Sequence, residues 1–181
     1  SIFFADDNII SNRKFARELF IALKEHNINW SCQASINVSK EDELLRLMKD
    51  SGCGSILIGL ESVSSENLSS MDKGINLRHD YYEAIRKIQS YGILVHGSFI
   101  LGYDFDTHES FKELTEFIDE TRLLMPLINI LTPFPGTKLF KRFEEEGRIF
   151  HKDWDKYDAK TVVFSPARMT PEELLEGQKR V

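Results

Sequence analysis

The sequence predicts an α/β protein built on a parallel β-sheet. Short apolar runs alternate along the chain with stretches in which apolar residues recur every third or fourth position, which is typical of helices with one buried face. Helices that join consecutive strands return the chain to the same edge, so the strands run parallel. Polar residues and glycines follow each run, at the edge where such sheets bind ligands. Periodicity alone leaves open whether the sheet closes into a barrel.

The apolar runs give the expected strands. They are Ile2–Ala5, Asn29–Ala34, Ser55–Leu60, Leu94–Leu101 and Leu127–Leu131, with a weaker sixth at Thr161–Phe164. Runs such as Ile56–Ile58 are continuously apolar, as in parallel sheets that are covered on both faces.

Four helices are expected between the strands, each with an apolar stripe that faces the core. The stripes are Phe15, Leu19, Ala22 and Leu23; Leu44, Leu47 and Met48; Tyr81, Ile85 and Ile88; and Phe111, Leu114, Phe117 and Ile118. Capping-box spacing marks helix starts at Ser39 with Asp42 and at Asp106 with Glu109. Thr170, followed by a proline and two acids, marks a last helix.

Composition limits the class of protein. The chain has 181 residues, which suits a single domain over 1–181 with a less regular extension over 148–181. The net charge of −6 argues against broad binding to nucleic-acid phosphates. Neither a membrane-length apolar run nor a signal-peptide pattern is seen, so a cytoplasmic protein is expected. Cys32 and Cys53 lack metal-ligand spacing and are expected to be buried, unpaired thiols.

The residues after each strand are the candidate site. The strand ends carry Asp6, Asp7 and Asn8; Gln33 to Asn37; Glu61 and Ser62; Gly102 to Asp104; and Thr132 to Thr137. In a parallel sheet these ends share one edge, so we expect the groups to converge there. Each group also has a structural explanation. Asp6–Asn8 could cap a helix, Gly97 and Gly102 could be packing glycines, and His96 could be a satisfied core histidine.

The order of these segments resembles the radical SAM superfamily, in particular the branch whose members carry an N-terminal cobalamin-binding domain. The resemblance rests on five segments in sequence and covers nearly the whole chain. The segments are 4–8 (FADDN), 52–62 (GCGSILIGLES), 71–74 (MDKG), 97–102 (GSFILG) and 132–137 (TPFPGT). It implies a partial TIM-like (βα) barrel of about five to six units.

The resemblance also implies cofactors and site residues. Members of the superfamily use a [4Fe–4S] cluster to cleave S-adenosylmethionine into methionine and a 5′-deoxyadenosyl radical. Asp6, Asp7 and Asn8 match the strand end near the methionine amino group, and Glu61 and Ser62 match the pair near the ribose hydroxyls. The segment with Gly97, Phe99 and Gly102 matches the border of the adenine. Gln33, Asn37, Asn129 and Thr132 are candidate substrate contacts, and no catalytic or metal-ligating residue is assigned.

One departure from the family is important. Its clusters are held by three cysteines spaced CxxxCxxC after the first barrel strand, and this sequence has no such segment. The matching strand and cluster loop would precede Ser1, so the chain is expected to be a fragment that binds no cluster alone. An unpartnered edge at Ile2–Ala5 would then favour self-association.

Two other functions remain open from the residues themselves. Asp6, Asp7, Glu61 and Asp104 could hold a divalent ion in a (βα)-barrel hydrolase or lyase. The chain could also be a non-catalytic nucleoside-binding domain. The substrate, the type of reaction and the use of cobalamin are not determined by the sequence.

Overall fold

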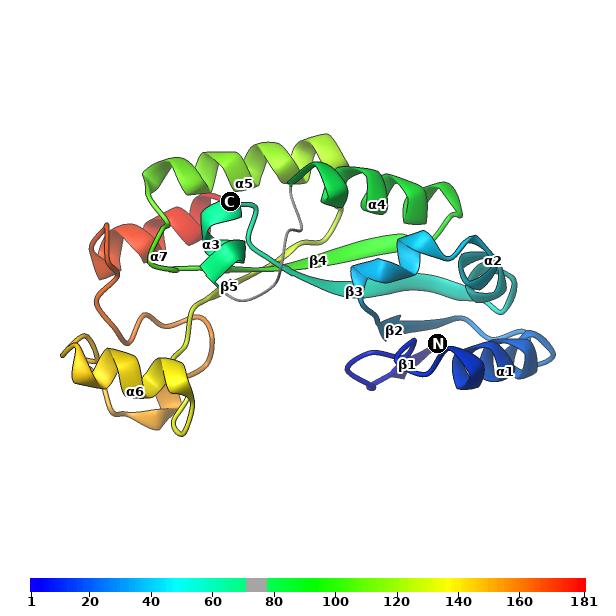
Figure 1. Cartoon of the computed structure of the whole chain (residues 1–181), viewed down its shortest axis with the longest axis horizontal. Helices are drawn as coiled ribbons and strands as arrows, with labels where there is room; N and C mark the ends of the chain where they lie inside the picture. The colour runs from blue at the N-terminus through cyan, green and yellow to red at the C-terminus, as the bar shows by residue number, and fades with distance from the viewer. Residues whose placement is uncertain (71–77) are drawn as a thin grey trace. The chain divides into compact units, whose positions relative to one another are not determined.

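The computed structural model describes residues 1–70 and 78–181 and contains one five-stranded sheet (Figure 1). Its strands are β1 (Ile2–Phe4), β2 (Trp30–Gln33), β3 (Cys53–Glu61), β4 (Leu94–Leu101) and β5 (Leu127–Ile130). They are hydrogen-bonded in chain order, and β2 pairs in parallel with both β1 and β3. The five main strands are therefore confirmed, within one or two residues at each end.

Helices join the strands, as the βα alternation predicts. They are α1 (Arg13–Lys24), η1 (Ile36–Lys40), α2 (Asp42–Asp50), α3 (Ser65–Ser70), α4 (Arg78–Ser90), α5 (His108–Thr121), α6 (Lys138–Glu145), η2 (Trp154–Lys156) and α7 (Pro171–Arg180). The fold class is a parallel α/β partial barrel. Among the residues that the structure describes, no helix is both long and apolar enough to cross a lipid bilayer.

The chain forms two compact units, which are described separately below. Unit 1 comprises Ser1–Leu60, the described residues of Asn76–Ser98, and Thr121–Leu127. Unit 2 comprises the described residues of Glu61–Ile75, with Phe99–Glu120 and Ile128–Val181. The Met71–Gly74 segment of the family resemblance lies outside the described residues.

Residues of β2, β3 and β4 alternate between buried and more exposed positions, so the expectation that these strands are covered on both faces is wrong. Along β4, Val95 and Phe99 are buried while His96 and Ser98 between them are partly exposed. The buried face packs on helices: Phe99 meets Phe117 of α5 with ring centroids 5.9 Å apart. The other face of β2, β3 and β4 is partly exposed and carries polar residues such as Gln33 and Ser98 beside apolar ones such as Ile100, and we call it the open face.

The buried side of α1 also differs from the predicted stripe. Ala16, Phe20 and Leu23 are buried, whereas Phe15 is 57% exposed. Phe20 stacks on Trp30 of β2, with ring centroids 5.1 Å apart. Apolar residues occur on more than one side of this helix, and the contact with Trp30 determines which side is buried.

Two of the predicted helix starts are wrong. Ser39 lies inside the extra 3₁₀ turn η1, and α2 begins after Glu41 without a side-chain cap. Asp106 accepts hydrogen bonds from backbone N–H groups that precede it, and its contact with α5 is with the side chain of Ser110 rather than with the backbone of the first turn. The start of α7 is confirmed, because Thr170 and Glu173 form both hydrogen bonds of a capping box.

The proposed sixth strand at Thr161–Phe164 is also wrong. The segment contributes a single antiparallel bridge, between Phe164 and Ile149. Phe164 is fully buried and packs against Phe143 of α6, with ring centroids 5.0 Å apart. The apolar run at 161–164 therefore reflects core packing rather than strand pairing.

Candidate functional site

The turn after β1 presents two exposed carboxylates in unit 1. Asp6 and Asp7 are exposed, and Asn8 is half-buried. The Asn8 Oδ1 accepts a hydrogen bond of 3.1 Å from the backbone N–H of Ser35, which ties this turn to the end of β2. The helix α1 is capped by Asn12, so the explanation of Asp6–Asn8 as its cap is wrong.

The other predicted residues of unit 1 lie in different surroundings. Gln33 ends β2 and is half-buried. Residues of β2 alternate between a buried and a half-buried side, and Gln33 lies on the half-buried side, which is the open face. Asn37 is exposed in η1 and lines a separate cavity of unit 1. Gly97 is buried within β4, on the face that carries Val95 and Phe99. Of these three residues, Gln33 alone belongs to the open face.

Glu61 ends β3 in an unusual backbone conformation. Its φ of 67° lies in the left-handed region, which costs an L-residue roughly 1–2 kcal/mol. The side chain is half-buried and makes interactions within the protein. Strain of this kind at a residue other than glycine is concentrated at functional sites, where it orients a side chain. Glu61 is therefore the strongest ligand-binding candidate in unit 2.

Next to Glu61 begins a buried polar network. The Ser62 Oγ accepts hydrogen bonds from the Ser64 N–H (3.1 Å) and the Asn67 Nδ2 (3.4 Å). Asn67 is fully buried, and its Nδ2 also donates to the Asp106 Oδ1 at 2.7 Å. The Phe105 N–H donates to the Asn67 Oδ1 at 3.3 Å. Ser62 and α3 are thereby joined to the turn that follows β4.

Asp106 organises that turn. Its Oδ2 accepts hydrogen bonds from the N–H groups of Gly102 (2.8 Å) and Tyr103 (2.9 Å). The carboxyl is 3% exposed, and burial raises its pKa although the bonds from Gly102, Tyr103, Asn67 and Ser110 oppose the shift. Burial, together with the charges of Glu61 and Asp106, also raises the pKa of the Tyr103 phenol, so Tyr103 stays protonated.

Glycine at position 102 is required by packing within unit 2. Its φ is 108°, and a Cβ there would lie 2.9 Å from the Leu174 Cδ2 and 3.1 Å from the Phe164 Cζ. Phe99 points its side chain at α5, leaving only its backbone available to a ligand. Thr132 is buried and donates to the Ile130 carbonyl at 3.1 Å, whereas Asn129 is half-buried and interacts within the protein.

Asn67 and the role of Asp106 are not predicted from the sequence. The spacing of Asp106 from Glu109 indicates only a local helix cap. The partner that matters, Asn67, lies 39 positions away. No local pattern identifies such a pair.

The described residues do not favour a divalent-metal site. No three His, Cys, Asp or Glu side chains among them gather into a possible metal-binding group. Asp104 is instead paired with Arg142 and Arg148, each at 2.8 Å. A hydrogen bond with Cys53 and burial raise the pKa of the Cys32 thiol, so Cys32 is poorly suited to act as a thiolate ligand.

Comparisons with known proteins identify the family. Residues 1–118 match the family model described as "Radical SAM superfamily". The chain is 36% identical over 174 residues to the bacteriochlorophyllide d C-12(1)-methyltransferase of Chlorobaculum tepidum, covering 96% of this chain and 38% of that protein. It is 36% identical over 159 residues to the hopanoid C-2 methylase of Rhodopseudomonas palustris, covering 84% and 30%.

A solved structure agrees in fold. The radical SAM methyltransferase TsrM from Kitasatospora setae, determined with cobalamin and a [4Fe–4S] cluster bound, superposes with a TM-score of 0.65 at 17% identity. The match covers 80% of this chain and 28% of that one. The chain thus spans well under half the length of these relatives. The parallel partial barrel, the family model and the methyltransferase relatives together establish that this chain belongs to the radical SAM superfamily.

Proposed function

We propose that this protein is a radical SAM enzyme that transfers a methyl group. The observation that carries the proposal is Glu61, a half-buried carboxylate held at φ 67° at the end of β3, in a chain 36% identical to two methyltransferases. When bound, a [4Fe–4S] cluster with S-adenosylmethionine supplies reductive cleavage to methionine and a 5′-deoxyadenosyl radical. Because such a cluster is held by three cysteines and this sequence has two that lack the CxxxCxxC spacing, the ligands of the cluster would come from a segment outside this chain.

The residues of this chain would bind and orient S-adenosylmethionine. The Glu61 carboxylate can accept hydrogen bonds from a ribose diol, and the strained backbone fixes its direction. Ser62 has a hydroxyl proton to donate, because its Oγ accepts both the hydrogen bond from the Ser64 N–H and that from the Asn67 side chain. The exposed carboxylates of Asp6 and Asp7 can hold an ammonium group. Gly97, Phe99 and Gly102 would act through their backbone, since Phe99 turns its ring to α5.

The substrate class follows from the relatives and the open face. A bacteriochlorophyllide and a hopanoid are both large and mostly apolar, and the two named relatives methylate them. We therefore propose a large apolar acceptor. Gln33 and Asn129 are half-buried candidates for substrate contacts, and Asn129 also interacts within the protein; Asn37 and Thr132 have a weaker claim. We also propose that the whole protein binds cobalamin through a separate domain, since the TsrM structure contains bound cobalamin. We further propose that two copies of this chain associate by pairing their β1 strands.

The binding test uses the cluster-loaded protein that includes the three-cysteine segment. Glu61→Ala should weaken S-adenosylmethionine binding by about tenfold or more, because it removes a hydrogen bond to a charged group. Equilibrium dialysis measures the affinity, and Glu66→Ala, an exposed acid on α3, is the matched control. Unchanged affinity in Glu61→Ala would remove Glu61 from the site.

A second measurement addresses the chemistry. Anaerobic incubation of the same protein with S-adenosylmethionine and dithionite should release 5′-deoxyadenosine, and a methyl-labelled cofactor should label an added apolar acceptor. If 5′-deoxyadenosine forms in the presence of reductant but no methylated product appears, the protein is a radical SAM enzyme that catalyses a reaction other than methyl transfer. Absence of both products from a protein with a full cluster would contradict the proposal.

A further inference from the structure

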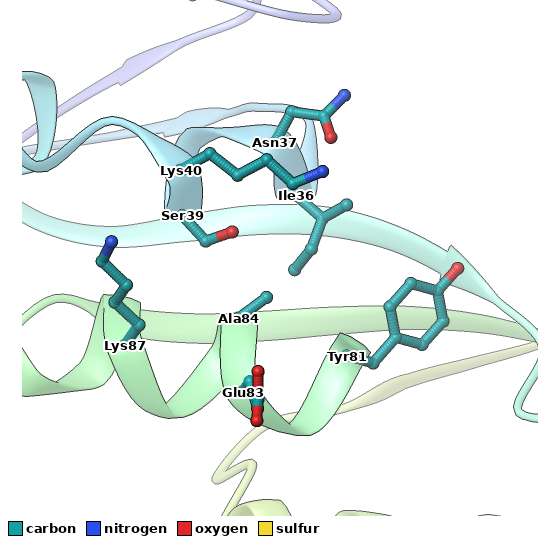
Figure 2. Close-up of a pocket in the computed structure, with 8 residues that line it drawn as sticks. All are labelled: Ile36, Asn37, Ser39, Lys40, Tyr81, Glu83, Ala84 and Lys87. Carbon is teal, nitrogen blue, oxygen red and sulfur yellow. The ribbon is translucent and has the colours of Figure 1, made fainter. Parts of the chain in front are cut away.

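Unit 1 contains a cavity on the side of the helices, apart from the open face of the strands. Its volume is about 290 Å³, and its walls come from η1 and α4 (Figure 2). Small-molecule sites usually measure about 300–1,000 Å³, so this one suits a small ligand. Among its lining residues, Asn37 alone has a place in the proposed methyl transfer, as one of the weaker candidates for a substrate contact.

A hydroxyl that has no hydrogen-bond partner among the described residues faces this cavity. Ser39 is 6% exposed, and Figure 2 shows its Oγ directed into the hollow between η1 and α4. Within the described part of the chain no hydrogen bond reaches this Oγ, because η1 takes Ser39 away from the start of α2 that it was expected to cap. The cavity leaves this Oγ accessible to water, and a ligand in the cavity could accept the hydrogen bond that the hydroxyl donates.

The charges on the two walls have opposite signs. Lys40, on η1, is exposed and forms no ion pair with any described residue. Lys87, on α4, is already neutralised by Asp42, with its Nζ 3.0 Å from the Oδ1. Glu83, which makes an interaction of its own, adds a carboxylate on the α4 wall, and a carboxylate can accept several hydrogen bonds at once. The cavity therefore carries a cationic side chain on η1 and an anionic one on α4.

We propose that this cavity binds a free α-amino acid with an apolar side chain. Its carboxylate would pair with Lys40 and accept the hydrogen bond of Ser39, and its ammonium group would donate to Glu83. Ile36 and Ala84 line the space between these groups and would contact the side chain. A purely anionic ligand would be repelled by Glu83, and a purely cationic one by Lys40.

Matched ligands and variants test the proposal on the full protein. The probes are L-leucine, 4-methylpentanoate, which lacks the amino group, and 3-methylbutylamine, which lacks the carboxylate. Binding is followed by isothermal titration calorimetry at millimolar ligand. L-Leucine should bind more tightly than either analogue, and Lys40→Gln or Ser39→Ala should weaken it about tenfold. Lys14→Gln, an exposed lysine without a described partner on α1, should leave it unchanged.

Stability separates a ligand site from a structural role for Ser39. Removing a hydroxyl that has no partner should leave the melting temperature of Ser39→Ala equal to or above that of the wild type. Glu83→Gln should lower the affinity for L-leucine but not for 4-methylpentanoate. A lower melting temperature in Ser39→Ala, equal binding of the three probes, or no L-leucine binding at all would each overturn the proposal. None of these outcomes depends on S-adenosylmethionine.

Discussion

The pair formed by Asn67 and Asp106 can be tested by exchanging its two side chains. In Asp106→Asn, the new amide oxygen can accept the bonds from Gly102 and Tyr103 only if the Nδ2 of the new asparagine occupies the position that the Asp106 Oδ1 has in the wild type. There the Nδ2 faces the Nδ2 of Asn67, which now donates to Oδ1 at 2.7 Å. Two donors then meet in a site where Asn67 is fully buried and Asp106 is 3% exposed.

The magnitude follows from that geometry. A buried donor left without an acceptor costs about 1–3 kcal/mol, and relief of the buried charge offsets part of this. We expect Asp106→Asn to lower the free energy of unfolding by about 2 kcal/mol. In the double variant Asn67→Asp with Asp106→Asn, the donor and acceptor are exchanged, and the acceptor for the Phe105 N–H remains.

The assay is urea denaturation followed by circular dichroism, on the wild type, both single variants and the double variant. Asn67→Asp alone should also be destabilised, because two carboxylates would meet in a buried site. The double variant should recover most of the loss, giving a coupling energy of about 1–3 kcal/mol. If the losses in the single variants simply add in the double variant, the hydrogen bond between these residues is not what holds the turn.

Three further predictions concern unit 2. Burial raises the pKa of Asp106 in the folded state, so the contribution of this residue to stability falls as pH rises through that pKa. The carboxyl ¹³C resonance of Asp106 should therefore titrate above the usual range for Asp. A midpoint at or below that range would contradict the burial of the carboxyl. Glu61→Gly should be more stable to urea than Glu61→Ala by about 1 kcal/mol, since only glycine is relaxed at φ 67°; equal stabilities would mean that position 61 is unstrained. Gly177→Ala should destabilise by about 1–3 kcal/mol, because its Cβ would lie 2.2 Å from the Phe111 ring, despite the gain of about 1 kcal/mol expected of alanine in a helix. Repeating that substitution in a Phe111→Ala background should restore the gain, and persistence of the loss would refute the steric explanation.

Local patterns in the sequence were enough to predict the strands and most of the helices. The run at Leu94–Leu101 coincides with β4, because a strand that ends in turn residues carries its boundaries in its own sequence. The capping box at Thr170 was predictable for the same reason, since both partners lie within one helical turn. Features defined by neighbouring residues are those that a single sequence reveals.

The errors arose where distant residues decide the structure. The buried side of α1 depends on the contact of Phe20 with Trp30, and spacing within the helix could not select it. Asp106 had the spacing of a helix cap, yet Asn67 determines its role. Glu61 was named as a candidate from the family resemblance, but its left-handed backbone was not predictable from any neighbour. The placement of Ser39 in η1, rather than at the start of α2, was missed in the same way.

The order of the strands has a consequence for the way the chain acquires its structure. Because β1 to β5 pair in the order of synthesis, each strand that leaves the ribosome meets an edge formed by the strand before it. No strand needs to wait for a segment made much later, and no loop must close across the whole chain, so the entropic barrier to each pairing stays small. The sheet can therefore grow vectorially, with every newly made βα unit covering the edge that its predecessor left exposed to aggregation.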